Sequence, residues 1–270
     1  MKNSPTATLT LLLLAAMLVG GCGSTTALQS ASPDREITVD GSTEDWQGAL
    51  TPIEKKNLSL GVLNDGEFLY LALVTSDRQL INQMMIRGLT VWFDAEGGKG
   101  KTFGIRFPLG LMASGAQFSP REMQQNPDAR RELFEASLAE LDILQSEDKS
   151  IRFPRQAVPR LHVMAKMNAG TLVYELQIPL RTGETHASAI DAEPGDVIGL
   201  GLETPEIDRE AMRQGGRGGG GGRGGRGGGG RGGVGGRGGG GRGGRGAPQQ
   251  QPESLKLWTT VELAADGTTE

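Results

Sequence analysis

Residues 58–75, LSLGVLNDGEFLYLALVT, decide the fold class of this chain of 270 amino acids. Apolar residues at 58, 60 and 62 alternate with polar or small ones, the period of a strand with one buried face. Asn64-Asp65-Gly66 is a turn signal, and the run from Phe68 to Thr75 is typical of a strand buried on both faces. The stretch therefore predicts two antiparallel strands in the core of a β protein.

Similar patterning recurs along the chain, and Gly, Pro, Asn or Asp stand in the connections. We expect strands at residues 37–39, 58–63, 68–75, 89–94, 102–107, 161–167, 172–178, 197–203 and 255–263. About nine such strands favour a mainly β domain over residues 35–264, an antiparallel immunoglobulin-like or jelly-roll sandwich, with a short tail at 265–270.

Residues 112–150 break this period and predict a helical insertion in the sandwich. Ser119-Pro120-Arg121-Glu122 has the form of a capping box, and Asn126 offers a second N-cap for a helix over residues 129–141. The apolar positions Leu133, Phe134, Leu138 and Leu141 fall on one face of that helix. We expect this face to pack on a sheet or over the open end of the sandwich.

The first 21 residues predict a signal peptide, because a basic start is followed by a short apolar run over residues 9–19. The sequence Val19-Gly20-Gly21-Cys22 resembles the lipobox of bacterial lipoproteins, although an ordinary secretory signal with a chance cysteine is the alternative. The resemblance implies that Cys22 is lipidated and holds the protein on a membrane. Gly23, rather than Asp, implies the outer membrane. Residues 22–34 predict a flexible tether.

Glycine and arginine dominate residues 215–246, which hold 24 Gly and 7 Arg. The remaining chain carries 21 basic and 32 acidic residues, so the overall net charge of −4 averages an acidic body and a basic segment. Lack of a three-residue period excludes collagen, and a single Cys excludes an internal disulfide framework.

The surrounding residues 213–252 predict a disordered loop inside the sandwich domain. Its Arg-Gly-Gly repeats resemble RNA-binding segments, but no Phe or Tyr interleaves the arginines, so we do not expect nucleic acid as a partner. Contact with phosphates of lipopolysaccharide, with acidic glycans or with the acidic body, and a repeat without a role, all stay open.

Four short stretches together resemble family 9 carbohydrate-binding modules and the wider DOMON-like group. They are ITVDG at 37–41 with Asp45-Trp46, NDGEFLYL at 64–71, LTVWFD at 89–94 and YELQIPL at 174–180. The resemblance implies a β-sandwich that binds sugars or, in some DOMON relatives, haem. The helical insertion and the glycine-arginine segment depart from that layout.

Strand parity places both strand tryptophans in the polar register. Trp92 alternates with apolar Val91 and Phe93, and Trp258 alternates with apolar Leu257. An exposed indole beside charged groups is a surface that suits a sugar ring. The candidate carbohydrate-binding residues are Trp92, Trp258, Arg106, Glu175 and Gln177. The alternative is that the inserted helices cover this face and bury the indoles.

Other chemistry has weaker support. Asp45 is a candidate calcium ligand, but no spaced series of oxygen ligands accompanies it. We expect the neighbouring Trp46 to be a core side chain. His162, Met164 and Met167 are candidate haem ligands, although methionine in a strand is more often core filler. Catalytic signatures such as Gly-x-Ser-x-Gly or His-Glu-x-x-His are missing from the sequence, and we do not expect an enzyme.

The sequence therefore predicts a membrane-anchored, non-catalytic binding module of the bacterial cell envelope, with carbohydrate as the expected ligand. A structural, assembly or adhesion lipoprotein that interacts with envelope proteins is the alternative. A haem-binding domain ranks below both.

Overall fold

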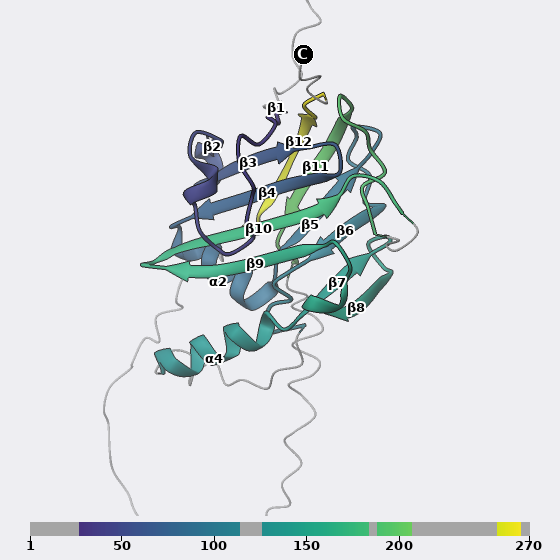
Figure 1. Cartoon of the computed structure of the whole chain (residues 1–270). Helices are drawn as coiled ribbons and strands as arrows, with labels where there is room; N and C mark the ends of the chain where they lie inside the picture. The colour runs from purple at the N-terminus through teal and green to yellow at the C-terminus, as the bar shows by residue number, and fades with distance from the viewer. Residues whose placement is uncertain (1–26, 114–125, 184–187, 207–252, 266–270) are drawn as a thin grey trace, which may run out of the picture.

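A computed structural model describes residues 27–113, 126–183, 188–206 and 253–265 (Figure 1). The predicted signal peptide with Cys22, the capping box that begins at Ser119 and the glycine-arginine loop at 213–252 lie outside the described residues.

The described chain forms two sheets. The seven-stranded sheet has the order β1-β12-β11-β5-β6-β7-β8, and the five-stranded sheet has the order β2-β3-β4-β10-β9. The first comprises β1 Leu28–Gln29, β12 Lys256–Glu262, β11 Val197–Glu203, β5 Thr90–Asp94, β6 Phe103–Arg106, β7 Glu140–Leu144 and β8 Ser150–Pro154. The second comprises β2 Leu50–Ile53, β3 Leu58–Asn64, β4 Phe68–Thr75, β10 Thr171–Pro179 and β9 His162–Asn168. Neighbouring strands are antiparallel except for β1 and β12.

The sheets pack face to face around one main core (Figure 1). Leu71, Tyr174 and Leu176 enter it from the five-stranded sheet, and Phe93 and Leu200 enter it from the other. Inward side chains alternate with outward ones along each strand, as a sandwich requires. The predicted mainly β, antiparallel sandwich is confirmed.

Eight of the nine expected strands are present, with ends that differ by about a residue. The ninth is absent, because residues 37–39 belong to neither sheet, although Ile37 is buried. Four short strands were not expected: β1, β2, β7 and β8. Each has only two to five residues, too few for a clear period.

The insertion is helical only in part. Helix α4 spans Pro127–Ser137, and the Asn126 side chain caps it by accepting from the backbone N–H groups of Asp128 and Ala129, as predicted. Phe134 packs into the main core. The predicted helix end at 141 is wrong, because Leu141 lies in β7, where it and Ile143 face the core at a spacing of two.

A second helix, α2 (Arg78–Arg87), was not predicted. Asp77 caps its first turn by accepting from the N–H groups of Gln79 and Leu80. Leu80, Ile81 and Met84 of α2 are buried in the main core. Short 3₁₀ turns occur at Glu44–Trp46, Glu54–Lys56 and Arg155–Ala157. None of the helices in the described ranges is long and apolar enough to cross a membrane.

The N-terminal segment packs onto the sandwich earlier than expected. Leu28 and Gln29 pair with β12, Leu28 is buried, and Ala31 bridges to Leu63. The expectation of a flexible tether as far as residue 34 is therefore wrong for residues 28–31. Backbone pairing and the burial of Leu28 hold this stretch against the sheet edge.

A second, smaller apolar cluster covers the outer face of the five-stranded sheet. Trp46 packs there with Ile37, Tyr70 and Ala72, and only 1% of its surface is exposed. The prediction that Trp46 is a core side chain is confirmed.

Candidate carbohydrate-binding site

Tryptophans and glycines form one row across the outer face of the seven-stranded sheet. From β12 to β6 the residues in register are Trp258, Gly201, Trp92 and Gly104. A Cβ atom on Gly201 would lie 2.6 Å from Cζ2 of Trp258, and one on Gly104 would lie 2.6 Å from Cε3 of Trp92. Each indole therefore lies across a glycine of the next strand, in space that any larger residue would fill.

A polar row runs beside it. The side chains in register from β12 to β8 are Lys256, Glu203, Thr90, Arg106, Asp142 and Arg152. Because side chains two apart on a strand share a face, the polar row and the indole row lie on the same outer surface.

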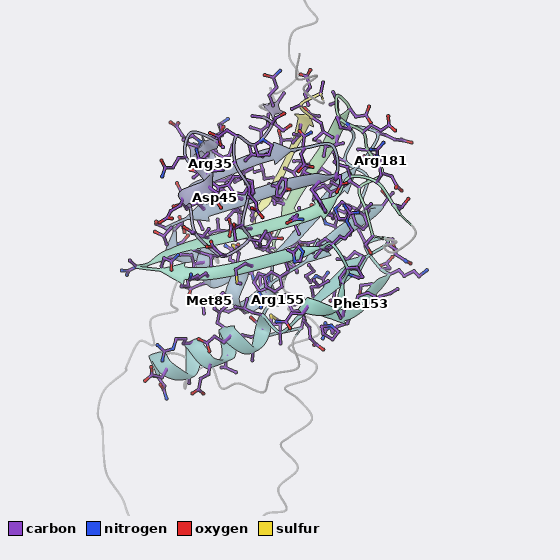
Figure 2. The ribbon with its side chains drawn as sticks, viewed as in Figure 1. Arg35, Asp45, Met85, Phe153, Arg155 and Arg181 are labelled. Carbon is purple, nitrogen blue, oxygen red and sulfur yellow. The ribbon has the colours of Figure 1, made fainter. Side chains whose placement is uncertain are left out.

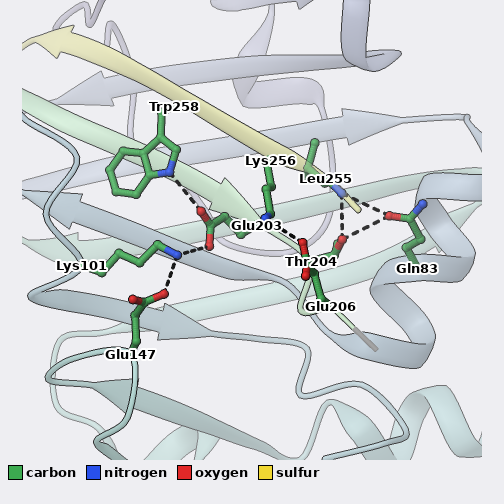
Figure 3. Close-up of polar contacts among 9 residues, drawn as sticks. All are labelled: Gln83, Lys101, Glu147, Glu203, Thr204, Glu206, Leu255, Lys256 and Trp258. Carbon is green, nitrogen blue, oxygen red and sulfur yellow. Dashed lines mark hydrogen bonds and ion pairs between the residues drawn. The ribbon is translucent and has the colours of Figure 1, made fainter. Parts of the chain in front are cut away.

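The two rows border a pocket of about 300 Å³. Its walls are Thr90, Trp92, Lys101, Arg106, Glu147, Glu203, Thr204, Pro205, Glu206 and Lys256. Trp258 adjoins the pocket through Glu203, because its Nε1 donates to Oε1 of Glu203 at 3.0 Å (Figure 3). The site thus combines one indole in the wall, a second beside it and several charged hydrogen-bonding groups.

Lys101 links two acidic side chains of the pocket. Its ammonium lies 2.7 Å from Oε1 of Glu147 and 2.8 Å from Oε2 of Glu203 (Figure 3). Burial alone would lower the pKa of Lys101, but the two carboxylates outweigh it and the pKa is raised. The same ammonium lies 5.8 Å from the centre of the Trp92 ring, within the range of a cation–π contact.

Trp92 is on the predicted face but is not exposed. It shows only 3% of its surface, so the expectation of an open indole at this position is wrong. Its ring packs against Gly104, and Lys101 lies over it. The groups that lie against the ring are therefore the backbone of β6 at Gly104 and the side chain of Lys101, which comes from the connection between β5 and β6.

Trp258 and Arg106 fit the predicted arrangement better. Trp258 is partly exposed and packs against Gly201. Arg106 lines the pocket with 25% of its side chain exposed. Burial lowers the pKa of the Arg106 guanidinium, Asp142 acts in the opposite direction, and Arg152 reinforces the fall.

Glu175 and Gln177 do not join this site, because both lie on β10 of the five-stranded sheet. Gln177 is partly exposed, but Glu175 is 1% exposed, so its expected outward exposure is wrong. The N-terminal segment covers Glu175: Trp46 Nε1 donates to its Oε1 at 2.7 Å, and the Gly41 N–H donates to its Oε2 at 2.5 Å.

Sequence reasoning missed Lys101, Glu147 and Glu203. Glu203 had a usable signal, since it follows Gly199 and Gly201 at strand spacing, and alternating glycines mark the close approach of large groups. Lys101 and Glu147 lie between strands, where no period predicts the direction of a side chain.

The candidate haem ligands do not fit a haem group. Two axial ligands must approach the iron from opposite sides. His162 and Met164 project side by side from one face of β9 and cannot flank an iron atom in this way, and Met167 projects from the other face of the strand. The sulfur of Met164 already accepts from Nη1 of Arg155 at 3.3 Å.

Asp45 acts within the N-terminal segment, where its carboxylate accepts from the Thr38 N–H at 3.0 Å. Across the described part of the chain, no group of three or more His, Cys, Asp or Glu side chains is arranged to hold a metal ion.

No protein-family model matches the chain, and no curated protein matches it. Among solved structures, it is similar to a family 9 carbohydrate-binding module from Caldicellulosiruptor kristjanssonii in complex with glucose, at 11% identity and a TM-score of 0.35, covering 68% of this chain and 81% of that one. A cellotriose complex of such a module from the same organism matches at 11% identity and a TM-score of 0.36, covering 68% and 79%. At these values the likeness does not identify a ligand for this chain.

Proposed function

We propose that this chain is a non-catalytic carbohydrate-binding module anchored to the bacterial cell envelope. The observation that carries the carbohydrate proposal is the side-by-side arrangement of the indole row and the charged pocket on one sheet face. A sugar presents an apolar C–H face and a rim of hydroxyl groups, and this surface offers a partner for each.

Trp258 is the proposed stacking residue, because it is the more exposed of the two indoles. Its Nε1 donates to Glu203 and its ring packs on Gly201, and these two contacts together hold the ring beside the pocket. Glu203 and Glu147 are acceptors for sugar hydroxyls, and Trp92 supplies an apolar wall. A ring that is held in place before binding loses little conformational entropy when the sugar arrives.

Affinity electrophoresis tests the carbohydrate proposal. The wild-type protein should be retarded in at least one gel of a panel that contains plant, algal and bacterial polysaccharides. Trp258→Ala should bind roughly tenfold more weakly, the size expected for the loss of an aromatic contact. Met167→Ala is the matched control, because Met167 is 40% exposed on β9 of the other sheet.

The proposal fails if the wild type migrates freely in every gel, or if Trp258→Ala and Met167→Ala bind alike. Co-purification of an envelope protein by a variant that has lost all glycan binding would favour the assembly or adhesion role.

Anchoring through Cys22 is proposed from the lipobox-like sequence. Each buried methylene of an acyl chain contributes about 0.8 kcal/mol, so two or more chains give stable attachment. Labelled palmitate should enter the wild-type protein in cells and not Cys22→Ser. A variant that keeps the label, or a wild type that never takes it up, would refute the anchor. Density separation of the two membranes then tests the proposed outer-membrane location.

A further inference from the structure

Arg106 is the cation of the pocket that lacks a close acidic partner in the described structure. Its Nε donates to Thr90 Oγ1 at a long 3.3 Å, and its Nη1 lies 3.9 Å from Oδ2 of Asp142. With 25% of the side chain exposed, the guanidinium has lost much of its water without gaining a short charged hydrogen bond.

Asp142 is already engaged by a second arginine. Nε of Arg152 donates to Oδ1 of Asp142 at 2.8 Å, and its Nη2 donates to Oδ2 at 3.2 Å, a bidentate contact. Arg152 also lies 3.9 Å from Glu140. Both oxygens of Asp142 are therefore committed to Arg152, and Asp142 leaves the donors of Arg106 unsaturated.

The other cations of the pocket are paired. Lys101 contacts Glu147 and Glu203, and Lys256 lies 2.7 Å from Glu206 (Figure 3). Each of the three glutamates in the pocket wall thus lies within 2.8 Å of a lysine. Among the described residues, no carboxylate lies that close to Arg106. The carboxylate of a ligand would therefore find unpaired guanidinium donors at Arg106.

We propose that Arg106 binds the carboxylate of a uronic acid, so that the ligand of this site is an acidic polysaccharide. This rests on the proposed carbohydrate-binding function and names the class of sugar. The planar guanidinium matches a carboxylate through two parallel N–H···O bonds. Thr90 accepts from Nε of the guanidinium and Asp142 lies near its Nη1, and the glutamates accept hydroxyl groups from the rest of the sugar.

The test compares acidic chains with their neutral counterparts. Oligogalacturonate, oligomannuronate and oligoglucuronate are titrated calorimetrically into the full-length protein, alongside the same chains with the carboxyl groups reduced to alcohols. The wild type should bind at least one acidic chain, and its reduced counterpart roughly tenfold to a hundredfold more weakly, the range for a charged hydrogen-bonded contact.

Three variants locate the effect. Arg106→Gln should lose the preference for the acidic chain and bind both chains like the reduced one. Arg106→Lys keeps the charge without the fork and should recover only part of the preference. Arg35→Gln is the matched control, because Arg35 is exposed and pairs with Asp34 away from the pocket. Circular dichroism and thermal melting confirm that each variant is folded.

The outcomes separate the two proposals. Equal binding of acidic and reduced chains, or an unchanged preference in Arg106→Gln, overturns the role of Arg106 and leaves carbohydrate binding standing. Sulfated oligosaccharides are titrated as a third series, and their binding in place of the uronates overturns the choice of a carboxylate. If no chain of any series binds and the polysaccharide gels also show no retardation, both proposals fail.

Discussion

The two carboxylate oxygens of Glu203 are held by different residues: Oε1 accepts from Nε1 of Trp258 at 3.0 Å, and Oε2 pairs with the Lys101 ammonium at 2.8 Å. Only 15% of the Glu203 side chain is exposed. One carboxylate therefore positions both the indole beside the pocket and the lysine that covers Trp92.

Glu203→Gln should lower stability by about 1 kcal/mol, because the amide keeps an acceptor for one partner and loses its charge toward Lys101. Urea denaturation measures the loss. Glu206→Gln, which alters a solvent-exposed pair with Lys256, should leave the urea midpoint nearly unchanged, because water screens exposed ion pairs. Equal effects of the two substitutions would show that Glu203 has no special structural role.

Gly201→Ala should lower stability by about 1–3 kcal/mol, because the new Cβ would lie 2.6 Å from Cζ2 of Trp258 and has to displace the ring. Tryptophan fluorescence should shift as the indole moves. The double variant Gly201→Ala, Trp258→Ala has no clash. Its loss of stability should therefore be smaller than the sum of the losses in the two single variants. Simple additivity in urea denaturation would contradict the packing of the indole on this glycine.

The sequence was sufficient for the sandwich, because β3, β4, β10 and β11 each carry a long apolar pattern that packing did not overrule. It failed where an element was short, as in β1 and β2, or where a helix and a strand compete for the same apolar residues. Leu141 illustrates the second case, since its spacing from Leu138 suits a helical face but its spacing from Ile143 suits the strand it occupies.

Parity was correct for the candidate residues, but the expected exposure was wrong for Trp92 and Glu175. Trp92 faces outward from the main core, yet neighbouring side chains bury it. Glu175 also faces away from the core, but the chain at residues 37–49 covers it. Alternation along a strand predicts which face a side chain takes. It does not predict what lies above that face, because this depends on segments distant in the sequence.

We expect the contribution of Glu175 to the stability of the fold to depend on pH. Burial raises the pKa of its carboxyl, more than the hydrogen bonds from Trp46 and Gly41 lower it. A folded-state pKa above the unfolded value gives stability that is present below the unfolded pKa and is lost as pH rises through the folded pKa. The Glu175 contribution should therefore decline from mildly acidic toward neutral pH.

Glu175→Gln isolates that decline. Glutamine does not titrate, so any cost of its amide beside the Gly41 N–H is the same at every pH. Because the wild type loses stability as pH rises from about 4 to 7, the stability of Glu175→Gln relative to the wild type should increase over that range. Urea denaturation at a series of pH values measures the difference. A constant difference would mean that the pKa of Glu175 is the same in the folded and unfolded states.

Tyr174→Phe should leave stability unchanged or raise it by about 1 kcal/mol. Tyr174 is fully buried, and its hydroxyl has no hydrogen-bond partner within the described structure. Burying an unpaired hydroxyl costs free energy, and the phenyl ring keeps the packing against Phe107. Urea denaturation compares the two proteins, and a loss above about 1 kcal/mol would show that the hydroxyl has a partner.

Deleting residues 215–246 should leave the melting temperature nearly unchanged. The described ends of the connection between β11 and β12 already meet, because the Thr204 N–H donates to the Leu255 carbonyl at 3.0 Å and the Leu255 N–H donates to Thr204 Oγ1 at 2.9 Å. Gln83 of α2 joins them through its Oε1, at 3.1 Å from Thr204 Oγ1 and 3.3 Å from the Leu255 N (Figure 3).

The cost of closing a loop grows only logarithmically with its length, so this deletion should alter the free energy of unfolding by less than about 1 kcal/mol. Gln83→Ala, which removes the shared acceptor at the base of the connection, should cost about 1–3 kcal/mol because buried donors lose their partner. Scanning calorimetry of both variants decides the matter. A deletion that melts as early as Gln83→Ala would mean that residues 215–246 contribute to the stability of the sandwich, whose described side chains are drawn in Figure 2.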